Sequence, residues 1–97
     1  MPAYVSLSKY TEQGMHSIKD SPARTQAVKD AAKGMGGRVI GVWWLMGEYD
    51  LMIIFEAPDD ETAMRGLVAN GMQGNLTSTT LRAFSEEEFG RVIGGLP

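Results

Sequence analysis

Two strongly apolar runs, separated by four residues, limit what this chain can fold into more than any other feature. The runs are VIGVWWLM at residues 39–46 and LMIIF at residues 51–55, and Gly47-Glu48-Tyr49-Asp50 joins them. β-branched and aromatic residues on both sides of a short loop that contains glycine are typical of a β-hairpin. We therefore predict strands over residues 38–46 and 50–57, with two carboxylates and a phenol at the tip.

Neither apolar run leaves a polar face for water. An antiparallel sheet with one face in solvent alternates between apolar and polar residues, so this hairpin must be covered on both sides. We expect Trp43 in the core and Trp44 against a partner subunit or a cavity. Strict alternation along the first run divides its side chains into two sets: Ile40, Val42, Trp44 and Met46 on one face, and Val39, Gly41, Trp43 and Leu45 on the other.

The rest of the chain supplies two more strands and two main helices. Residues 3–10 alternate in polarity, and residues 76–83 are rich in β-branched residues, so both segments are predicted to be strands. Ser21 is expected to N-cap a helix that has Pro22 in its first turn and ends before residue 36. A second helix should begin at Asp59 or Asp60 and end near residue 72, and Thr11 is expected to cap a short helical turn.

The clearest local motif lies near the C-terminus. Ser85 and Glu88 have the spacing of a capping box, and Phe84 and Phe89 occupy the two positions of a hydrophobic staple. We predict a short C-terminal helix that ends at about residue 93.

This order of elements predicts an α+β fold, a ferredoxin-like βαββαβ sandwich with a four-stranded antiparallel sheet, within one domain over residues 1–97. Both main helices would lie on one face of the sheet. Because the other face is apolar, we expect it to pair with a second copy, in a homodimer or a higher homo-oligomer. The polar residues of the outer strands are expected either to line a cavity at that interface or to pack across the strands: Tyr4, Ser6, Ser8, Tyr10 and the hydroxyl residues at 77–80.

Composition and charge narrow the possible partners. The chain has 97 residues, a formal net charge of −3 and scattered Lys and Arg, so we expect no nucleic-acid partner. No apolar run reaches the length of a membrane span, and no secretory segment begins the chain, so a cytoplasmic protein without a membrane partner is expected. There is no cysteine, and His16 is the only histidine, so we expect neither a metal site nor a cofactor.

The G-x-Y-D hairpin and several separated blocks are similar to the GYD-domain family. The blocks are residues 4–11, 21–22, 44–50, 56–61 and 80–84. The resemblance implies the dimeric α/β-barrel architecture, in which two sheets pair face to face. The hairpin also resembles the sensing half of leucine-responsive (feast/famine) transcription regulators, which bind amino acids at subunit interfaces. Cofactor-free monooxygenases share the barrel, but no set of residues here matches their catalytic groups.

Among the polar residues, Asp50 is the best placed for a function. Its carboxylate is expected either to accept backbone N–H bonds in the turn or to hold an amine or a proton of a ligand. Lys9 and Arg82, near strand ends, are expected to hold an anion or to pair with surface carboxylates. The candidates for ligand binding or for a subunit interface are Gly47, Glu48, Tyr49, Asp50, Trp44, Tyr4, Tyr10, Lys9 and Arg82.

These residues favour a binding or sensing module that holds a small polar metabolite at or near a subunit interface. Two alternatives stay open: a cofactor-free enzyme that uses Tyr and Asp for proton transfer, and a purely structural oligomer. No catalytic residue can be assigned from the pattern.

Overall fold

The computed structural model describes residues 1–97 and contains four strands and five helical segments. The bounds are β1 (Ala3–Tyr10), α1 (Glu12–His16), the 3₁₀ turn η1 (Ile18–Asp20), α2 (Ser21–Gly34), β2 (Arg38–Trp44), β3 (Leu51–Glu56), α3 (Asp60–Gly71), β4 (Leu76–Ala83) and α4 (Glu86–Gly94). The predicted order of elements is confirmed.

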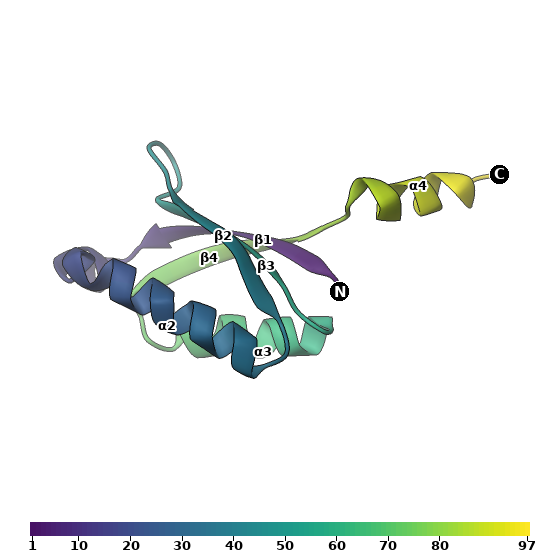
Figure 1. Ribbon diagram of the computed structural model, residues 1–97. Coiled ribbons are helices and arrows are strands. Elements are labelled where there is room, and N and C mark those ends of the chain that lie inside the picture. The colour runs from purple at the N-terminus through teal and green to yellow at the C-terminus, as the bar shows by residue number, and fades with distance from the viewer.

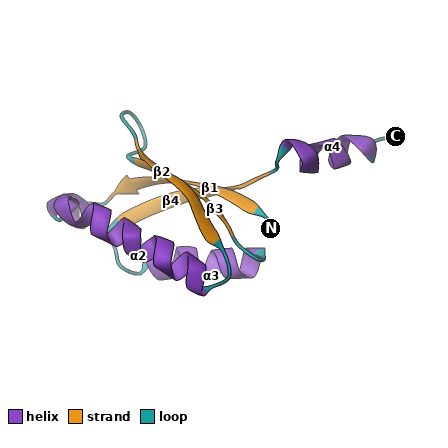
Figure 2. Cartoon of the chain, viewed as in Figure 1, coloured by secondary structure: helices purple, strands orange, loops and turns teal.

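The four strands form one antiparallel sheet in the order β2-β3-β1-β4. Helices α2 and α3 lie side by side against one face of this sheet, while no helix covers the other face (Figure 1). Figure 2 shows the same arrangement as two layers, with strands above helices. The α+β ferredoxin-like fold predicted from the sequence is therefore confirmed.

Three of the predicted helix starts are confirmed, and one is wrong. Thr11 caps α1, Asp59 caps α3, and Ser85 with Glu88 forms the capping box of α4. Ser21, in contrast, lies inside the first turn of α2, and its hydroxyl is hydrogen-bonded to the Tyr10 hydroxyl instead of to a backbone N–H. This serine does not cap the helix because its own backbone is already helical, with φ −56° and ψ −44°, whereas an N-cap residue is not helical.

The hairpin strands are shorter than predicted. β2 ends at Trp44 and β3 begins at Leu51, so residues 45–50 form the connecting loop. The backbone N–H of Leu45 donates to the Asp50 carbonyl at 2.9 Å, after which the chain turns through Gly47 with a φ of 116°. Glycine adopts this left-handed conformation without the steric penalty that a Cβ brings.

A register shift in β2 changes which side chains share a face. Val39 pairs with Phe55, and Gly41 pairs with Ile54, so Ile40 is the extra residue of a β-bulge. Directly opposed residues of antiparallel strands project to the same face. Val39 therefore lies on the helix side, and the prediction that it shares a face with Gly41 and Trp43 is wrong.

Tyr4, Ser6, Ser8 and Tyr10 of β1 face the helices, not the uncovered side. Tyr4, Ser6 and Ser8 are buried. The prediction that they line a cavity between paired sheets is therefore wrong. Their polar atoms are satisfied inside the protomer, where Ser6 accepts a bond from Thr80 at 3.1 Å and Ser8 bonds with Ser78 at 2.9 Å.

Apolar side chains occupy the uncovered face, which we call the open face. By register it carries Val5, Leu7, Trp43, Met52, Ile54 and Leu81, with Lys9, Thr77 and Thr79 toward one end. Trp43 lies on this face over Gly41, whereas Trp44 lies on the helix side opposite Leu51. The two tryptophans do face opposite ways, but the expected assignment is reversed, and each is about half exposed, so neither is core.

The buried core is small, and α4 projects from it. Only 10 of 97 residues are buried. The radius of gyration is 14.7 Å, against about 12.5 Å for a compact chain of this length. Figure 1 shows the cause, because α4 extends beyond the sheet at the end of β4. A chain of this shape leaves much apolar surface uncovered.

Candidate functional site

Asp50, at the base of the hairpin loop, has a structural role. Its Oδ2 accepts a hydrogen bond from the backbone N–H of Tyr10 at 3.0 Å, and its own N–H donates to the Ser8 carbonyl at 2.9 Å. These two bonds attach the loop to the end of β1. The carboxylate therefore accepts a hydrogen bond from a backbone N–H, which is one of the two roles expected from the sequence. The donor, however, belongs to β1 and not to the turn.

The loop tip is held by one charge contact and one aromatic contact. Lys9 Nζ lies 3.8 Å from Glu48 Oε1 and 5.3 Å from the centre of the Tyr49 ring. Both side chains of the ion pair are largely exposed, so the pair contributes at most about 1 kcal/mol. Gly47 completes the tip through its positive φ.

Tyr10 links the hairpin to the start of α2. Its hydroxyl accepts a bond from Trp44 Nε1 at 2.9 Å and bonds with the Ser21 hydroxyl. Trp44 is therefore fixed by a polar contact on the helix side of the sheet. Together with the loop, these residues form one cluster at the C-terminal end of β1.

Tyr4 lies at the opposite end of β1, in a second cluster. Its ring stacks on Phe55, with 5.1 Å between centroids, and its hydroxyl donates to Asp60 Oδ1. Burial, together with this hydrogen bond to a carboxylate, raises the pKa of Tyr4 from 10.0 to about 12. The phenol therefore stays protonated at neutral pH and acts as a donor.

Arg82 connects this second cluster to α4. Its Nη2 donates to Glu88 Oε2 at 2.9 Å, and its guanidinium lies 4.6 Å from the centre of the Phe84 ring. The bond from Arg82, with the backbone N–H of Ser85, lowers the pKa of Glu88 from 4.5 to about 2. The nine candidate residues thus divide between two ends of β1 and do not meet at one site.

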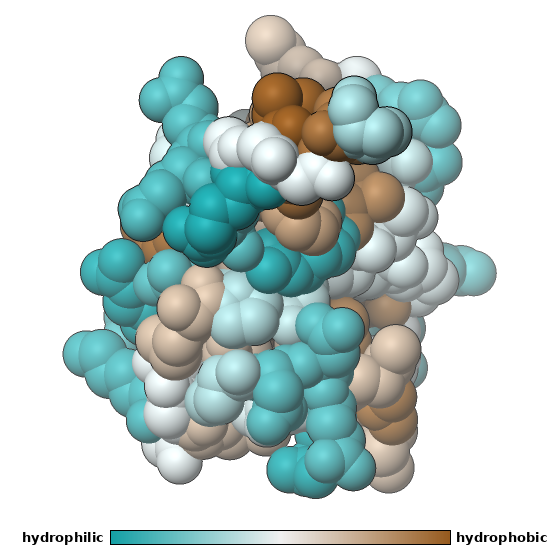
Figure 3. Space-filling view, turned by 90° about the vertical axis from the view of Figure 1, so that its right-hand side faces the viewer, coloured by the Kyte–Doolittle hydropathy of each residue, from teal (hydrophilic) through white to brown (hydrophobic).

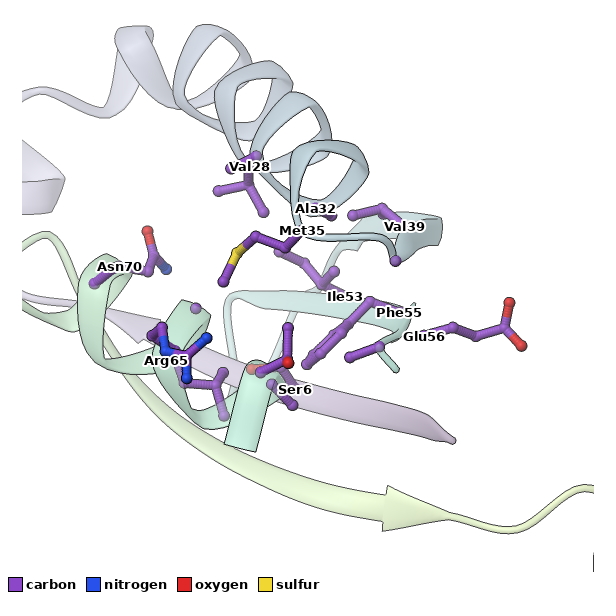
Figure 4. Close-up of a pocket in the computed structure, with 18 of the residues that line it drawn as sticks. Ser6, Val28, Ala32, Met35, Val39, Ile53, Phe55, Glu56, Arg65 and Asn70 are labelled. Atoms are coloured by element: carbon purple, nitrogen blue, oxygen red, sulfur yellow. The ribbon is translucent and has the colours of Figure 1, made fainter. Parts of the chain in front are cut away.

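A cavity lies elsewhere, between the helix layer and the sheet. It has a volume of about 450 Å³, within the ~300–1,000 Å³ range of small-molecule pockets. In Figure 4, Val28 and Ala32 of α2, with Met35 directly after the helix, lie above Ile53 and Phe55 of the sheet. Ser6, Ser8, Arg24, Asn70 and Gln73 add polar groups to the lining.

None of the nine predicted site residues lines this cavity. The pattern that points to it is the alanine-rich face of α2, where Ala27, Ala31 and Ala32 leave room that larger side chains would fill. That face predicts close packing on the sheet as readily as a cavity. Only the spacing of the layers decides between the two.

The structure contains neither a metal-binding cluster nor a membrane-spanning helix. No three His, Cys, Asp or Glu side chains come together in a position to hold a metal ion. No helix has both the length and the apolar content needed to cross a bilayer.

A model of one protein family matches almost the whole chain. The GYD domain aligns with residues 4–93. This chain belongs to the GYD-domain family. A relative from Thermus thermophilus, named "Glutamine synthetase and cystathionine beta-lyase binding protein", is 29% identical over 84 residues, which are 86% of this chain and 88% of the relative. The similarity predicted from the hairpin and the separated blocks is confirmed.

Proposed function

We propose that this GYD-domain protein is a small oligomeric binding module that holds a small organic molecule within each subunit. The half-open cavity of about 450 Å³ between α2, α3 and the sheet carries the proposal, because its size and its largely apolar lining with a few polar groups match those of small-molecule sites. The sequence favoured a polar metabolite at or near a subunit interface. The inward orientation of Ser6 and Ser8 now favours a position inside the subunit.

The geometry favours binding over proton transfer. A Tyr–Asp enzyme needs both groups to reach one enclosed ligand. The Asp50 carboxylate is occupied by the Tyr10 N–H, outside the cavity, and the Tyr4 phenol already donates to Asp60. Neither residue lines the cavity between the helices and the sheet.

A thermal-shift screen with small acids, alcohols and amines tests the proposal. The matched variant is Ala32→Leu, whose larger side chain extends into the cavity. We expect at least one class of compound to raise the melting temperature of the wild type and not that of the variant. A library that shifts neither protein, or shifts both equally, would contradict ligand binding in the cavity.

A second copy of the chain is our proposed cover for the open face. Four strands at ~4.8 Å spacing and ~23 Å length give roughly 450 Å² in projection, a substantial part of the ~800 Å² per partner of a stable interface. The face also has an apolar centre around Leu7 and Met52 with Lys9 and Thr77 toward one end, which resembles the apolar core and polar rim of protein interfaces. Two identical faces can pair about a twofold axis.

The Thermus thermophilus relative supports a second candidate function, the binding of an enzyme subunit. In this chain α4 carries the half-exposed apolar residues Phe89, Val92 and Ile93, and no layer of the fold covers them. Figure 3, which looks at the molecule from the α4 end, shows hydrophobic and hydrophilic residues side by side on that surface. An amphipathic helix of this kind fits an apolar groove on a protein.

Co-sedimentation of this protein with purified glutamine synthetase from its own source organism tests this second candidate. We expect Ile93→Asp to abolish the association and Glu86→Ala, at the start of the same helix, to preserve it. Equal association of both variants would exclude α4 as the binding element.

A further inference from the structure

Arg24 brings an unbalanced positive charge to the cavity. Its Nη1 donates to Ser17 Oγ at 3.1 Å, but its Nη2 is buried and has no hydrogen-bond partner. None of the six ion pairs of the chain includes Arg24. A buried guanidinium nitrogen without an acceptor is unfavourable, because it has lost its water and gained nothing in return.

No acidic side chain in the cavity lining balances this charge. Glu56 is the only acidic residue that lines the cavity, and its Oε1 accepts a bond from Arg38 Nε at 2.5 Å. Figure 4 shows the Glu56 side chain pointing away from the cavity. The chain itself therefore offers no acceptor to Arg24 Nη2, and a molecule that enters the cavity can supply one.

Two amides lie at the same end of the cavity as Arg24. Asn70 and Gln73 line the cavity, and all three residues also line a smaller adjoining pocket. Amide N–H groups donate to oxygen acceptors, so this end has the chemistry of an oxyanion site. The remainder of the lining is mainly apolar, as the Val28, Met35 and Ile53 side chains in Figure 4 illustrate.

We infer that the cavity binds an amphipathic carboxylate, with the carboxylate on Arg24 and the apolar tail between α2 and the sheet. The planar guanidinium presents donors in a fork that matches the two oxygens of a carboxylate. The tail replaces empty space beside short alanine side chains. This inference deepens the proposed function and rests on it, since it names the chemical class of the ligand that the cavity holds.

Isothermal titration with octanoate and with 1-octanol tests the inference. The two probes have tails of the same length and differ in the charged head. We expect the wild-type protein to bind octanoate at least tenfold more tightly than octanol. Arg24→Gln should weaken octanoate binding at least tenfold, whereas Lys29→Gln, which removes the same charge from an exposed position of α2, should change it less than twofold.

Ala32→Leu locates the site independently of Arg24, so the test survives if Arg24→Gln fails to fold. This variant should lose both probes. Octanoate binding that is unchanged in Ala32→Leu would overturn the inference, because the site would lie elsewhere. Equal affinities of the wild type for octanoate and octanol, with both lost in Ala32→Leu, would overturn the carboxylate inference and leave the proposed function standing. Failure of the wild type to bind either probe would overturn the inference, and the wider screen would then decide the proposed function separately.

Discussion

Replacement of Tyr4 by Phe removes one hydroxyl from a buried aromatic residue of the core. Phe keeps the ring that stacks on Phe55, so the change isolates the hydrogen bond to Asp60. A hydrogen bond to a charged group contributes about 1.5–3 kcal/mol. Because the Asp60 side chain is exposed, we expect a loss of unfolding free energy at the lower end of this range, about 1.5 kcal/mol. For a domain of this size that loss lowers the melting temperature by roughly 6–12 °C.

Thermal and urea unfolding, followed by circular dichroism, measure this loss. Tyr49→Phe is the matched control, since the Tyr49 phenol sits at the loop tip beside Lys9 and should lose little. The pKa of Tyr4 is raised from 10.0 to about 12, so its protonated form stabilises the folded state fully below pH 10. That contribution disappears as the pH rises from 10 to 12, and the gap between wild type and Tyr4→Phe should close over this range. Equal losses in the two variants, or a gap that persists at pH 12, would contradict this role of the Tyr4 hydroxyl.

Three further substitutions test other contacts. Glu88→Gln should destabilise the protein above pH 4.5 and match the wild type near pH 2. The bond from Arg82 lowers the pKa of Glu88 from 4.5 to about 2, so the carboxylate stabilises the fold only where it is ionised. Thermal melts from pH 2 to 6 measure this difference. Asp50→Ala leaves the Tyr10 N–H without its acceptor and should cost about 1–3 kcal/mol in urea unfolding; an unchanged midpoint would contradict the structural role of Asp50. Gly47→Ala should lower the free energy of unfolding by about 1–2 kcal/mol through the φ of 116° alone, because a Cβ at this position meets open space. A variant more stable than the wild type in the same urea unfolding would show that the turn relaxes.

The order of elements and the helix caps follow from local chemistry, and local chemistry is readable in a sequence. Thr11, Asp59 and Ser85 each satisfy backbone N–H groups of their own helix, within three residues. Ser21 has the same local pattern but bonds with Tyr10, which is eleven residues away along the chain and adjacent in space. A prediction from local pattern fails where a tertiary contact offers a competing partner.

The facing of the strands depends on pairing, which alternation alone does not reveal. β1 has one polar and one mostly apolar set of side chains, and the sequence suggested an interface cavity or cross-strand packing for the polar set. In the structure Ser6 and Ser8 turn inward because Thr80 and Ser78 of β4 satisfy their hydroxyls across the strands. The bulge at Ile40 then shifts the facing of β2, which reverses the expected positions of the two tryptophans.

The candidate site was missed for a related reason. Polar residues cluster in sequence around the G-x-Y-D hairpin, and this clustering predicts a site there. In the structure most of them hold the loop to β1 or pack around it. Arg24 stands alone on an otherwise ordinary helix, and nothing near it in the chain marks it. Its significance depends on an orphaned Nη2 and on the space beside it, and both are properties of the packed layers.

Pairing of two open faces is tested most directly by sedimentation velocity at micromolar concentration. We predict that the wild type sediments at twice the 10.6 kDa mass of one chain. Met52→Lys, at the centre of the open face, should sediment as a monomer, while Met64→Lys, on the exposed side of α3, should remain a dimer. A wild-type protein that sediments as a stable 10.6 kDa monomer, or a Met52→Lys variant that stays dimeric, would contradict the pairing.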